Sequence, residues 1–151
     1  MDQLIEQLKR HEGFKAHVYR CSAGKLSIGY GYNLQANPLK LSSIEINHLH
    51  TNGIDEFEAE RLLKLMIARI TDQLEQAIPF INHLNSARQD VIINMAYNMG
   101  LPGLLKFKKT LVLIEAEYYA QAAKEMLNSK WYTDVGHRAV ELAEQMKLGA
   151  Y

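Results

Sequence analysis

Three side chains near the N-terminus have the types and the spacing for acid–base chemistry. Glu12 carries a carboxyl group, Cys21 a thiol nine positions later and Ser27 a hydroxyl six positions after that. Hydrolysis of a glycosidic bond needs a proton donor for the leaving oxygen and, on the other face of the sugar, a group that attacks or holds a water. The set meets both needs if the chain folds Cys21 and Ser27 toward Glu12. Spacing alone does not establish such a site, because these residue types also recur by chance.

The segment that carries Glu12 is predicted to be a helix over residues 2–12. Its apolar positions share one face, basic residues lie near its C-terminus and Gly13 can end it. Glu12 then stands at the negative end of the helix dipole, which favours the neutral carboxyl and suits it to donate a proton. The alternative is an exposed glutamate at a helix end with no chemical role.

The segment after this helix changes to the period of β-strands. Residues 17–20 suit a strand and residues 22–25 a turn, and over residues 26–32 large side chains alternate with small ones. The small positions are Ser27, Gly29 and Gly31. Glycines in a strand often mark the close approach of a ligand, so we expect this face of the hairpin to form the floor of a cleft. The alternative is a bulged, twisted edge hairpin.

Residues 33–53 are polar and irregular, with Pro38 and an Asn-Gly pair as turn signals, and are predicted to form loops plus one further short strand. His48 and His50 raise the hypothesis of a metal site. No third ligand is near them in the sequence, and the helical spacing of metal-binding histidines is missing. Solvent-facing loop histidines are therefore the favoured interpretation, and no metal is expected.

A long helix is predicted over residues 55–77. Asp55 is a good N-cap, Glu58 completes a capping pair and Pro79 stops the helix. Its apolar stripe is too long for one small core, so we expect this helix to connect two lobes.

Several more helices are predicted after Pro79. One is capped by Asn85, ends at Gly100 and is apolar around most of its circumference, so it should be the buried centre of a helical lobe. Shorter helices are predicted near residues 101–107, 109–115 and 118–128. Asp134 is expected to cap the last helix. The predicted fold class is therefore α+β and mainly α.

Composition fits one compact domain that is divided into two lobes. The chain has 151 residues, of which 48% are hydrophobic, and this is ample for a core. Lys plus Arg and Asp plus Glu balance at 17 each, so no nucleic-acid partner is expected. Cys21 is the only cysteine, which excludes an internal disulfide and fits a reducing compartment. The N-terminal stretch has acidic residues and no continuous apolar run, so neither a secretory signal nor a membrane anchor is expected.

The residues around the three reactive side chains resemble the motif of phage lysozymes of the T-even type, glycoside hydrolase family 24. Members carry a Glu, then an Asp or Cys nine residues on, then a Thr six further. The matching positions are Glu12-Gly13, Tyr19, Cys21, Gly24 and Ser27-Ile28-Gly29-Tyr30-Gly31. Further landmarks follow in the same order at Thr51-Asn52-Gly53-Ile54, Ile92-Ile93-Asn94-Met95, Asn98-Met99-Gly100, Ser129-Lys130-Trp131-Tyr132 and Arg138-Ala139. The resemblance covers essentially the whole chain.

The resemblance implies a lysozyme-like fold of two lobes. A first helix at 1–12 packs on the C-terminal lobe, residues 13–54 form a small β-containing lobe, residues 55–77 the connecting helix and residues 78–151 the helical lobe. The implied activity is that of a muramidase, which hydrolyses the β-1,4 bond between N-acetylmuramic acid and N-acetylglucosamine in peptidoglycan. No cofactor is implied.

The resemblance also assigns roles to individual residues. Glu12 matches the general acid of the family, and Cys21 and Ser27 match the pair that holds and activates a water. Arg138 resembles the arginine that forms an ion pair with the catalytic glutamate. The positions expected to contact substrate are Gly31, Tyr97, Asn98 and Thr110. Two departures concern the water site: a neutral thiol is a poorer base than a carboxylate, and serine lacks the methyl group of threonine.

The implied partner is bacterial peptidoglycan, and the protein is expected to be a monomer that does not insert stably into membranes. It would accumulate in the cytoplasm of an infected bacterium, reach the wall through a separate, holin-like membrane lesion and cause lysis as an endolysin. Two alternatives remain. One is a cell-wall-binding or virion component of the same fold with weak catalysis. The other is a peptidase or amidase with Cys21 as nucleophile and His11 or His17 as base, which the turn and strand signals after Cys21 disfavour.

Overall fold

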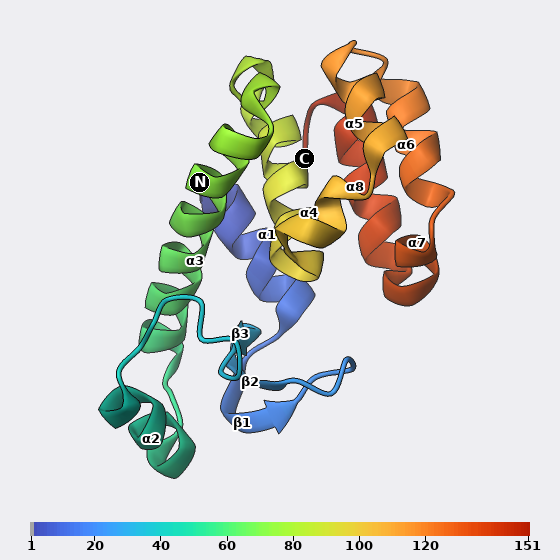
Figure 1. Ribbon diagram of the computed structural model, residues 1–151. Helices are drawn as coiled ribbons and strands as arrows, with labels where there is room; N and C mark the ends of the chain where they lie inside the picture. Colours follow the sequence, from blue (N-terminus) through green and yellow to red (C-terminus); the bar gives the residue numbers. More distant parts are fainter. Residues whose placement is uncertain (1) are drawn as a thin grey trace. The chain divides into compact units, whose positions relative to one another are not determined.

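A computed structural model describes residues 2–151, which form mostly helices and one small antiparallel sheet (Figure 1). The elements up to the long helix are α1 (Asp2–Glu12), β1 (Lys15–Arg20), β2 (Leu26–Gly29), β3 (Tyr32–Asn33), α2 (Ser43–Asn52) and α3 (Glu56–Ala77). The later elements are η1 (Pro79–His83), α4 (Ser86–Leu105), α5 (Lys108–Glu115), α6 (Tyr119–Leu127), α7 (Lys130–Val135) and α8 (His137–Leu148). The predicted fold class, α+β and mainly α, is confirmed.

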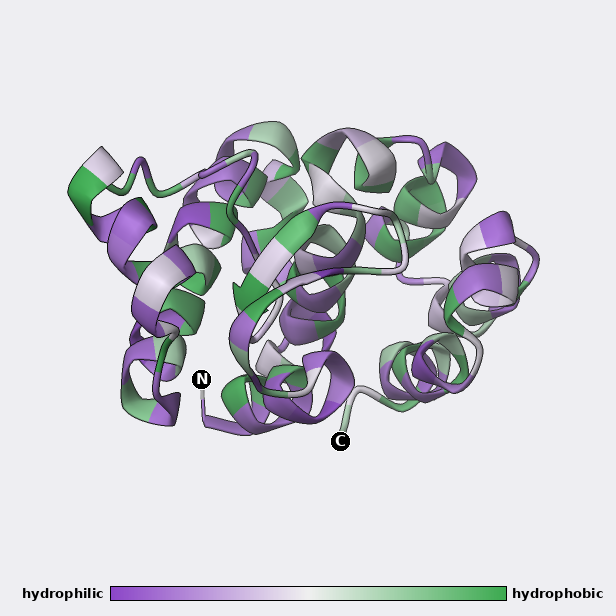
Figure 2. Ribbon diagram, turned by 90° about the horizontal axis from the view of Figure 1, so that it is seen from below, coloured by the Kyte–Doolittle hydropathy of each residue, from purple (hydrophilic) through white to green (hydrophobic). Residues whose placement is uncertain are grey.

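The chain divides into two compact units, residues 1–69 and residues 70–151. The division falls inside α3, so each unit contains part of this helix. Along the helices the colour changes between hydrophilic and hydrophobic within each turn (Figure 2), which is typical of amphipathic helices with one buried face. Among residues 2–151, none of the helices combines the length and the apolar character that a membrane span needs.

The sheet of the first unit has the strand order β1-β2-β3, with both pairs antiparallel. The predicted hairpin is confirmed, since Tyr19 pairs with Ser27 across β1 and β2. The alternation over residues 26–32, however, is not one strand. The backbone has φ +66° at Gly29 and φ +76° at Gly31, a region that favours glycine, so the chain turns here and starts β3. Gly29 and Gly31 therefore allow the chain to turn between β2 and β3, in addition to leaving a surface without side chains.

The residues between β3 and α3 were predicted as loops with a short strand, and this prediction is wrong for residues 43–52. Ser42 caps a helix there, because its Oγ accepts a hydrogen bond from the Glu45 backbone N–H at 3.1 Å. Ile46 and Leu49 are partly buried against the core of this unit. That core consists of Ile28, Tyr32, Leu34 and Leu62. His48 and His50 are exposed on the helix, and no group of three or more His, Cys, Asp or Glu side chains among residues 2–151 is placed to hold a metal ion.

Lys9 fixes the end of α1 to the rest of the first unit. Its ammonium lies 2.5 Å from a carboxylate oxygen of Glu60 on α3 and 6.0 Å from the centroid of the Tyr30 ring. The Phe14 ring packs on Tyr30 with 5.6 Å between the ring centroids. The helix end that carries Glu12 is thereby held beside the turn that carries Gly31.

The predicted helix caps of α3 and α4 are confirmed. Asp55 Oδ1 accepts from the Glu58 N–H at 2.8 Å, and Asn85 Oδ1 accepts from the Arg88 N–H at 3.0 Å. In α4, the run Val91–Ala96 is buried on every side, as its apolar sequence predicts. The helix bends at Gly100, where φ is +79°.

The second unit ends in α8, which packs against α4, α6 and α7. Asp134 was predicted to cap this last helix, and that prediction is wrong. Asp134 lies inside α7, where it pairs with Lys130 at 2.8 Å. Ser129 caps α7 instead, since its Oγ accepts from the Tyr132 N–H at 3.1 Å, and α8 starts directly after Gly136.

Candidate active site

The carboxyl group of Glu12 lies against Gly31. Glu12 is the last residue of α1 and is half-buried. A Cβ built on Gly31 would be 3.1 Å from Glu12 Oε2 and 3.2 Å from its Cδ, which is closer than ordinary van der Waals contact. Any side chain at this position would displace the carboxyl group. Gly31, predicted as a substrate contact, is therefore also a residue that positions the acid.

Tyr19 lies near both Glu12 and Cys21. Burial raises the pKa of the Tyr19 phenol, and the negative charges of Glu12 and Cys21 raise it further. Such an electrostatic effect requires that both groups be close to the phenol. Tyr19 was only part of the sequence motif, and its strand position, opposite Ser27, is what brings it to the acid and the thiol.

The thiol of Cys21 is held in the turn that follows β1. Burial raises the pKa of this thiol, but hydrogen bonds from the backbone at Lys25 and Ala23 and from the Ser27 side chain outweigh burial and lower it below its ordinary value. Ser27 is buried on β2, and its hydroxyl also lies 3.2 Å from the Lys25 carbonyl oxygen. The structure thus places the Ser27 hydroxyl where it lowers the pKa of the Cys21 thiol.

Together these residues give the first unit a carboxyl group, a phenol and a thiol–hydroxyl pair around one sheet. A half-buried carboxyl can give a proton to a leaving group, and a thiolate that accepts hydrogen bonds can take one from water. The geometry therefore supplies an acid and a base within residues 12–31.

The predicted contact residues Tyr97 and Asn98 lie near the end of α4. Asn98 Oδ1 accepts a hydrogen bond from Trp131 Nε1 at 2.7 Å, so the indole on α7 is fixed to α4. Phe107 meets the same indole edge to face, with 6.0 Å between ring centroids. Tyr97 is half-buried one position before Asn98. The rings of Trp131 and Phe107 are therefore held in fixed orientations next to Asn98.

Thr110 lies at the start of α5 and is buried. With Phe107 and Trp131 it lines a cavity of about 280 Å³ that also includes Lys106 and Lys130. Lysines, a hydroxyl and two aromatic rings around one cavity suit a polar ligand with apolar faces, such as a sugar. Neither these lysines nor Trp131 was singled out as a contact residue by the sequence, although the aromatic residues could have indicated a sugar platform.

Arg138 is anchored by Asn94. Its Nε and Nη2 lie 3.1 Å and 2.8 Å from Asn94 Oδ1, and Asn94 is completely buried on α4. Asn94 was not predicted as a functional residue. The signal was present, because a single amide inside the apolar run Val91–Ala96 must find hydrogen-bond partners when it is buried.

A mainly helical chain with one small antiparallel sheet near its N-terminus is a lysozyme-like α+β fold. The candidate acid lies at the end of α1, and the thiol and the hydroxyl lie on the β1–β2 hairpin. Residues 9–145 match the family model of phage lysozyme, and the chain therefore belongs to the phage lysozyme family, whose members are glycoside hydrolases.

Three relatives of this chain carry different names and come from different organisms. The protein named probable T4-type lysozyme 2 of Dictyostelium discoideum is 29% identical over 163 residues, which cover 99% of this chain and 96% of that protein. The pre-baseplate central spike protein Gp5 of Enterobacteria phage T4 is 27% identical over 90% of this chain and 26% of its own length. The endolysin of Acyrthosiphon pisum secondary endosymbiont phage 1 is 26% identical over 82% of this chain and 75% of its own.

Replacement of Gly31 by alanine is predicted to displace the acid. We expect Gly31→Ala to lower kcat/KM for glycoside hydrolysis about 10-fold, because the carboxyl group must shift by a few tenths of an ångström and a shift of about 1 Å costs about 100-fold. The matched control is Gly24→Ala. Gly24 has a similar φ of +78° but no atom within 4 Å of a built Cβ. Both variants carry the same backbone penalty, so an equal loss of activity in the two would contradict a contact between residue 31 and the acid.

Removal of the Ser27 hydroxyl is predicted to raise the pKa of the Cys21 thiol, because a hydrogen bond that favours the thiolate is lost. Cys21 is the only cysteine, so the rate of alkylation by iodoacetamide against pH reports on this thiol alone. The midpoint should move to higher pH in Ser27→Ala and stay low in Ser27→Thr, which keeps the hydroxyl. An alkylation midpoint that is the same in Ser27→Ala as in the parent would show that the Ser27 hydroxyl does not affect the pKa of the Cys21 thiol.

Proposed function

We propose that this protein is a muramidase that hydrolyses the β-1,4 bond between N-acetylmuramic acid and N-acetylglucosamine in bacterial peptidoglycan. The observation that carries the proposal is the close approach of the Glu12 carboxyl group to Gly31, beside a thiol–hydroxyl pair on the same sheet. Membership of the phage lysozyme family gives the reaction class. The proposal adds the substrate and the roles of individual residues.

Glu12 is the general acid in this proposal. Its carboxyl group donates a proton to the glycosidic oxygen as the bond to the sugar breaks, so the leaving sugar departs as an alcohol. The position at the end of α1 supports this role, because the negative end of a helix dipole favours a protonated carboxyl. Gly31 leaves the space that the carboxyl group occupies.

Cys21 and Ser27 hold the water that attacks the sugar. The hydrogen bonds to Cys21 favour the thiolate, which accepts a proton from this water far better than a neutral thiol does. Ser27, buried and in contact with the thiol, orients both groups. Catalysis then needs the Glu12 carboxyl protonated and the Cys21 thiol ionised. A carboxyl group ordinarily loses its proton at a lower pH than a thiol, so this form is a minority of the protein and is most populated between the two pKa values. Activity should therefore be highest between them, and the lowered thiol pKa increases the active fraction.

Arg138 is proposed to form an ion pair with Glu12 and to fix its rotamer. Its positive charge favours the ionised carboxyl group and so opposes the effect of the helix end on protonation. Asn94 supports this role, because its oxygen holds two nitrogens of the guanidinium and so sets the plane of the group. Tyr97, Asn98 and Thr110 are proposed to contact the sugar chain, together with Gly31. The fixed indole of Trp131 and the cavity beside Thr110 support this assignment.

The biological role proposed is that of an endolysin that lyses the host cell. The endolysin relative supports it. In this role the protein acts as a monomer on the wall of an infected bacterium and reaches it from the cytoplasm through a separate membrane lesion. The relative named as a central spike protein favours a second candidate, a virion component that degrades the wall on entry. Detection of the chain in purified virions would decide for the second.

Replacement of Glu12 by glutamine is predicted to abolish clearing of isolated sacculi, because the amide cannot give a proton to the leaving oxygen. We expect the rate of clearing to fall by at least about 100-fold, because a general acid usually accelerates a reaction by this factor or more. The fold should be kept, because the two side chains have the same shape, and the melting temperature should change by no more than about 4 °C through loss of the proposed pairing with Arg138. If Glu12→Gln clears sacculi at the parent rate, Glu12 is not the general acid.

For the thiol, the same assay compares two further variants. Cys21→Asp should stay active, because a carboxylate is also a base, whereas Cys21→Ala should lose activity. Full activity of Cys21→Ala would make the thiol a bystander and leave the role of Glu12 intact.

A further inference from the structure

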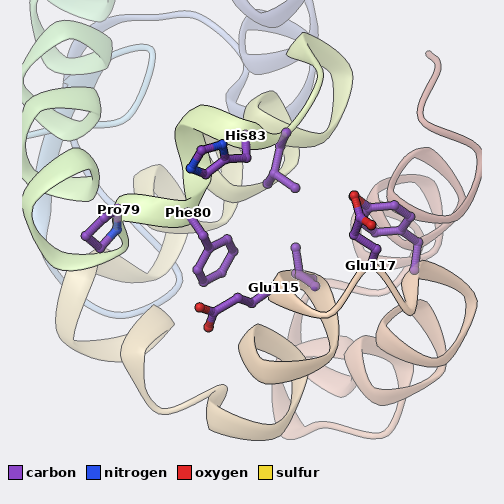
Figure 3. A pocket seen from close by; sticks show the side chains of 8 residues that line it. Pro79, Phe80, His83, Glu115 and Glu117 are labelled. Carbon is purple, nitrogen blue, oxygen red and sulfur yellow. The ribbon is translucent and has the colours of Figure 1, made fainter.

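We propose that a second pocket, formed only by residues of the second unit and by none assigned to hydrolysis, binds an alkylammonium ion, a primary amine on a hydrocarbon chain. The pocket has a volume of about 340 Å³ and lies where η1 meets the segment that joins α5 to α6. Its size is in the range of small-molecule sites. Phe80 and His83 of η1 line it, together with Glu115, Glu117 and Tyr119 from the end of α5 to the start of α6. Figure 3 shows the side chains of Phe80, His83, Glu115 and Glu117 around the pocket.

The walls of the pocket combine aromatic rings with carboxylates. Phe80 and Tyr119 are half-buried and offer apolar surface to a hydrocarbon chain. Neither Glu115 nor Glu117 has an ion-pair or hydrogen-bond partner for its carboxylate among residues 2–151. In the view of Figure 3, the Glu115 carboxylate lies beside the Phe80 ring and the Glu117 carboxylate on the other side of the pocket. Aromatic rings next to unpaired carboxylates are the surroundings that organic cations prefer.

The cation that stacks on the Tyr119 ring is already hydrogen-bonded to other groups. The Arg88 guanidinium stacks on Tyr119, with its carbon 3.6 Å from the ring centroid. Its nitrogens donate to the carbonyl oxygens of Met146 and Lys147 at 2.8 Å and 3.0 Å. Arg88 therefore neutralises neither glutamate by direct contact, and it shows that the Tyr119 ring accepts a cation. The Phe80 side of the pocket remains for a ligand.

The backbone at Glu117 supports a function for its carboxylate. Glu117 follows α5 with φ +66°, in the left-handed region. The Glu117 N–H bonds to the Ile114 carbonyl at 3.0 Å and the Tyr118 N–H to the Leu113 carbonyl at 2.8 Å. These are the two hydrogen bonds of a Schellman helix end, a position at which glycine is usual and a β-carbon is unfavourable. A glutamate that strains the backbone at the edge of a pocket is expected to supply something that glycine cannot.

The ligand class follows from charge and shape. Anions are repelled by the two carboxylates, whereas an ammonium group pairs with either of them and its hydrocarbon chain covers the Phe80 ring. A metal ion is disfavoured, because His83, Glu115 and Glu117 do not form a group that could hold one within the described residues 2–151. The same ammonium chemistry occurs in free alkanediamines and in lysine side chains of peptides.

Isothermal titration of the intact protein tests the proposal with three probes: 1,5-diaminopentane, Nα-acetyl-lysine amide and glutarate. We expect the two amines to bind and glutarate, an anion of similar length, not to bind. Glu115 and Glu117 are exposed, so each ion pair with the amine is worth up to about 1 kcal/mol, and Glu117→Gln and Glu115→Gln should each weaken amine binding by about 3- to 5-fold. Glu144→Gln, which changes an exposed glutamate on α8, is the matched control and should bind as the parent does. Tighter binding of the lysine amide assigns the pocket to peptides, and tighter binding of the diamine assigns it to free diamines.

A second variant separates binding from folding. Glu117→Gly removes the carboxylate and relieves the strained backbone, so amine binding should weaken while the melting temperature stays the same or rises by up to about 4 °C. Failure of both amines to bind would overturn the proposal, as would equal affinities in Glu117→Gln and the Glu144→Gln control. Wall hydrolysis by the Glu117 variants should equal that of the parent, so this result and a failure of the muramidase proposal are distinguishable.

Discussion

The carboxyl group of Glu12 can lie over the turn after β2 only because residue 31 has no side chain. A Cβ at Gly31 would stand 3.1 Å from Glu12 Oε2, and the backbone there is in the left-handed region that glycine favours. Lys9 holds the same end of α1 through its ion pair with Glu60. The position of the acid thus depends on a helix end, a glycine turn and one ion pair, and each is set by residues of the first unit.

The thiol needs a different kind of support. A neutral thiol is a poor base, and burial alone would make it poorer because burial disfavours the thiolate. The turn after β1 reverses this effect by directing backbone N–H groups at Cys21 while β2 supplies the Ser27 hydroxyl. The hairpin therefore does more than display the cysteine. It changes the proton affinity of the thiol in the direction that a water-activating group requires.

Much of this arrangement could be predicted from the sequence, because local signals control it. Asp55 and Asn85 cap their helices as expected. The spacing of Glu12, Cys21 and Ser27 was only suggestive, and the resemblance to a family motif is what singled out these residues as candidates. Residues 43–52 were missed because Pro38 and the polar residues around them outweighed the Ser42 capping signal. Asn94 and Tyr19 were missed for another reason. The single amide in an apolar run indicates that Asn94 needs a hydrogen-bond partner, but that partner, Arg138, lies far along the chain. Tyr19 lies opposite Ser27 across a strand pair, and no local pattern contains this pairing.

The central claim is hydrolysis of a glycosidic bond in peptidoglycan by an activated water, and mass spectrometry of the products tests it most directly. Isolated sacculi would be digested with the purified protein in water enriched in heavy oxygen. The account predicts soluble fragments that end in reducing N-acetylmuramic acid and carry one heavy oxygen at the new end, because the attacking oxygen comes from water. Fragments that end in unlabelled anhydro sugars, or that are cut only at amide bonds, would contradict it.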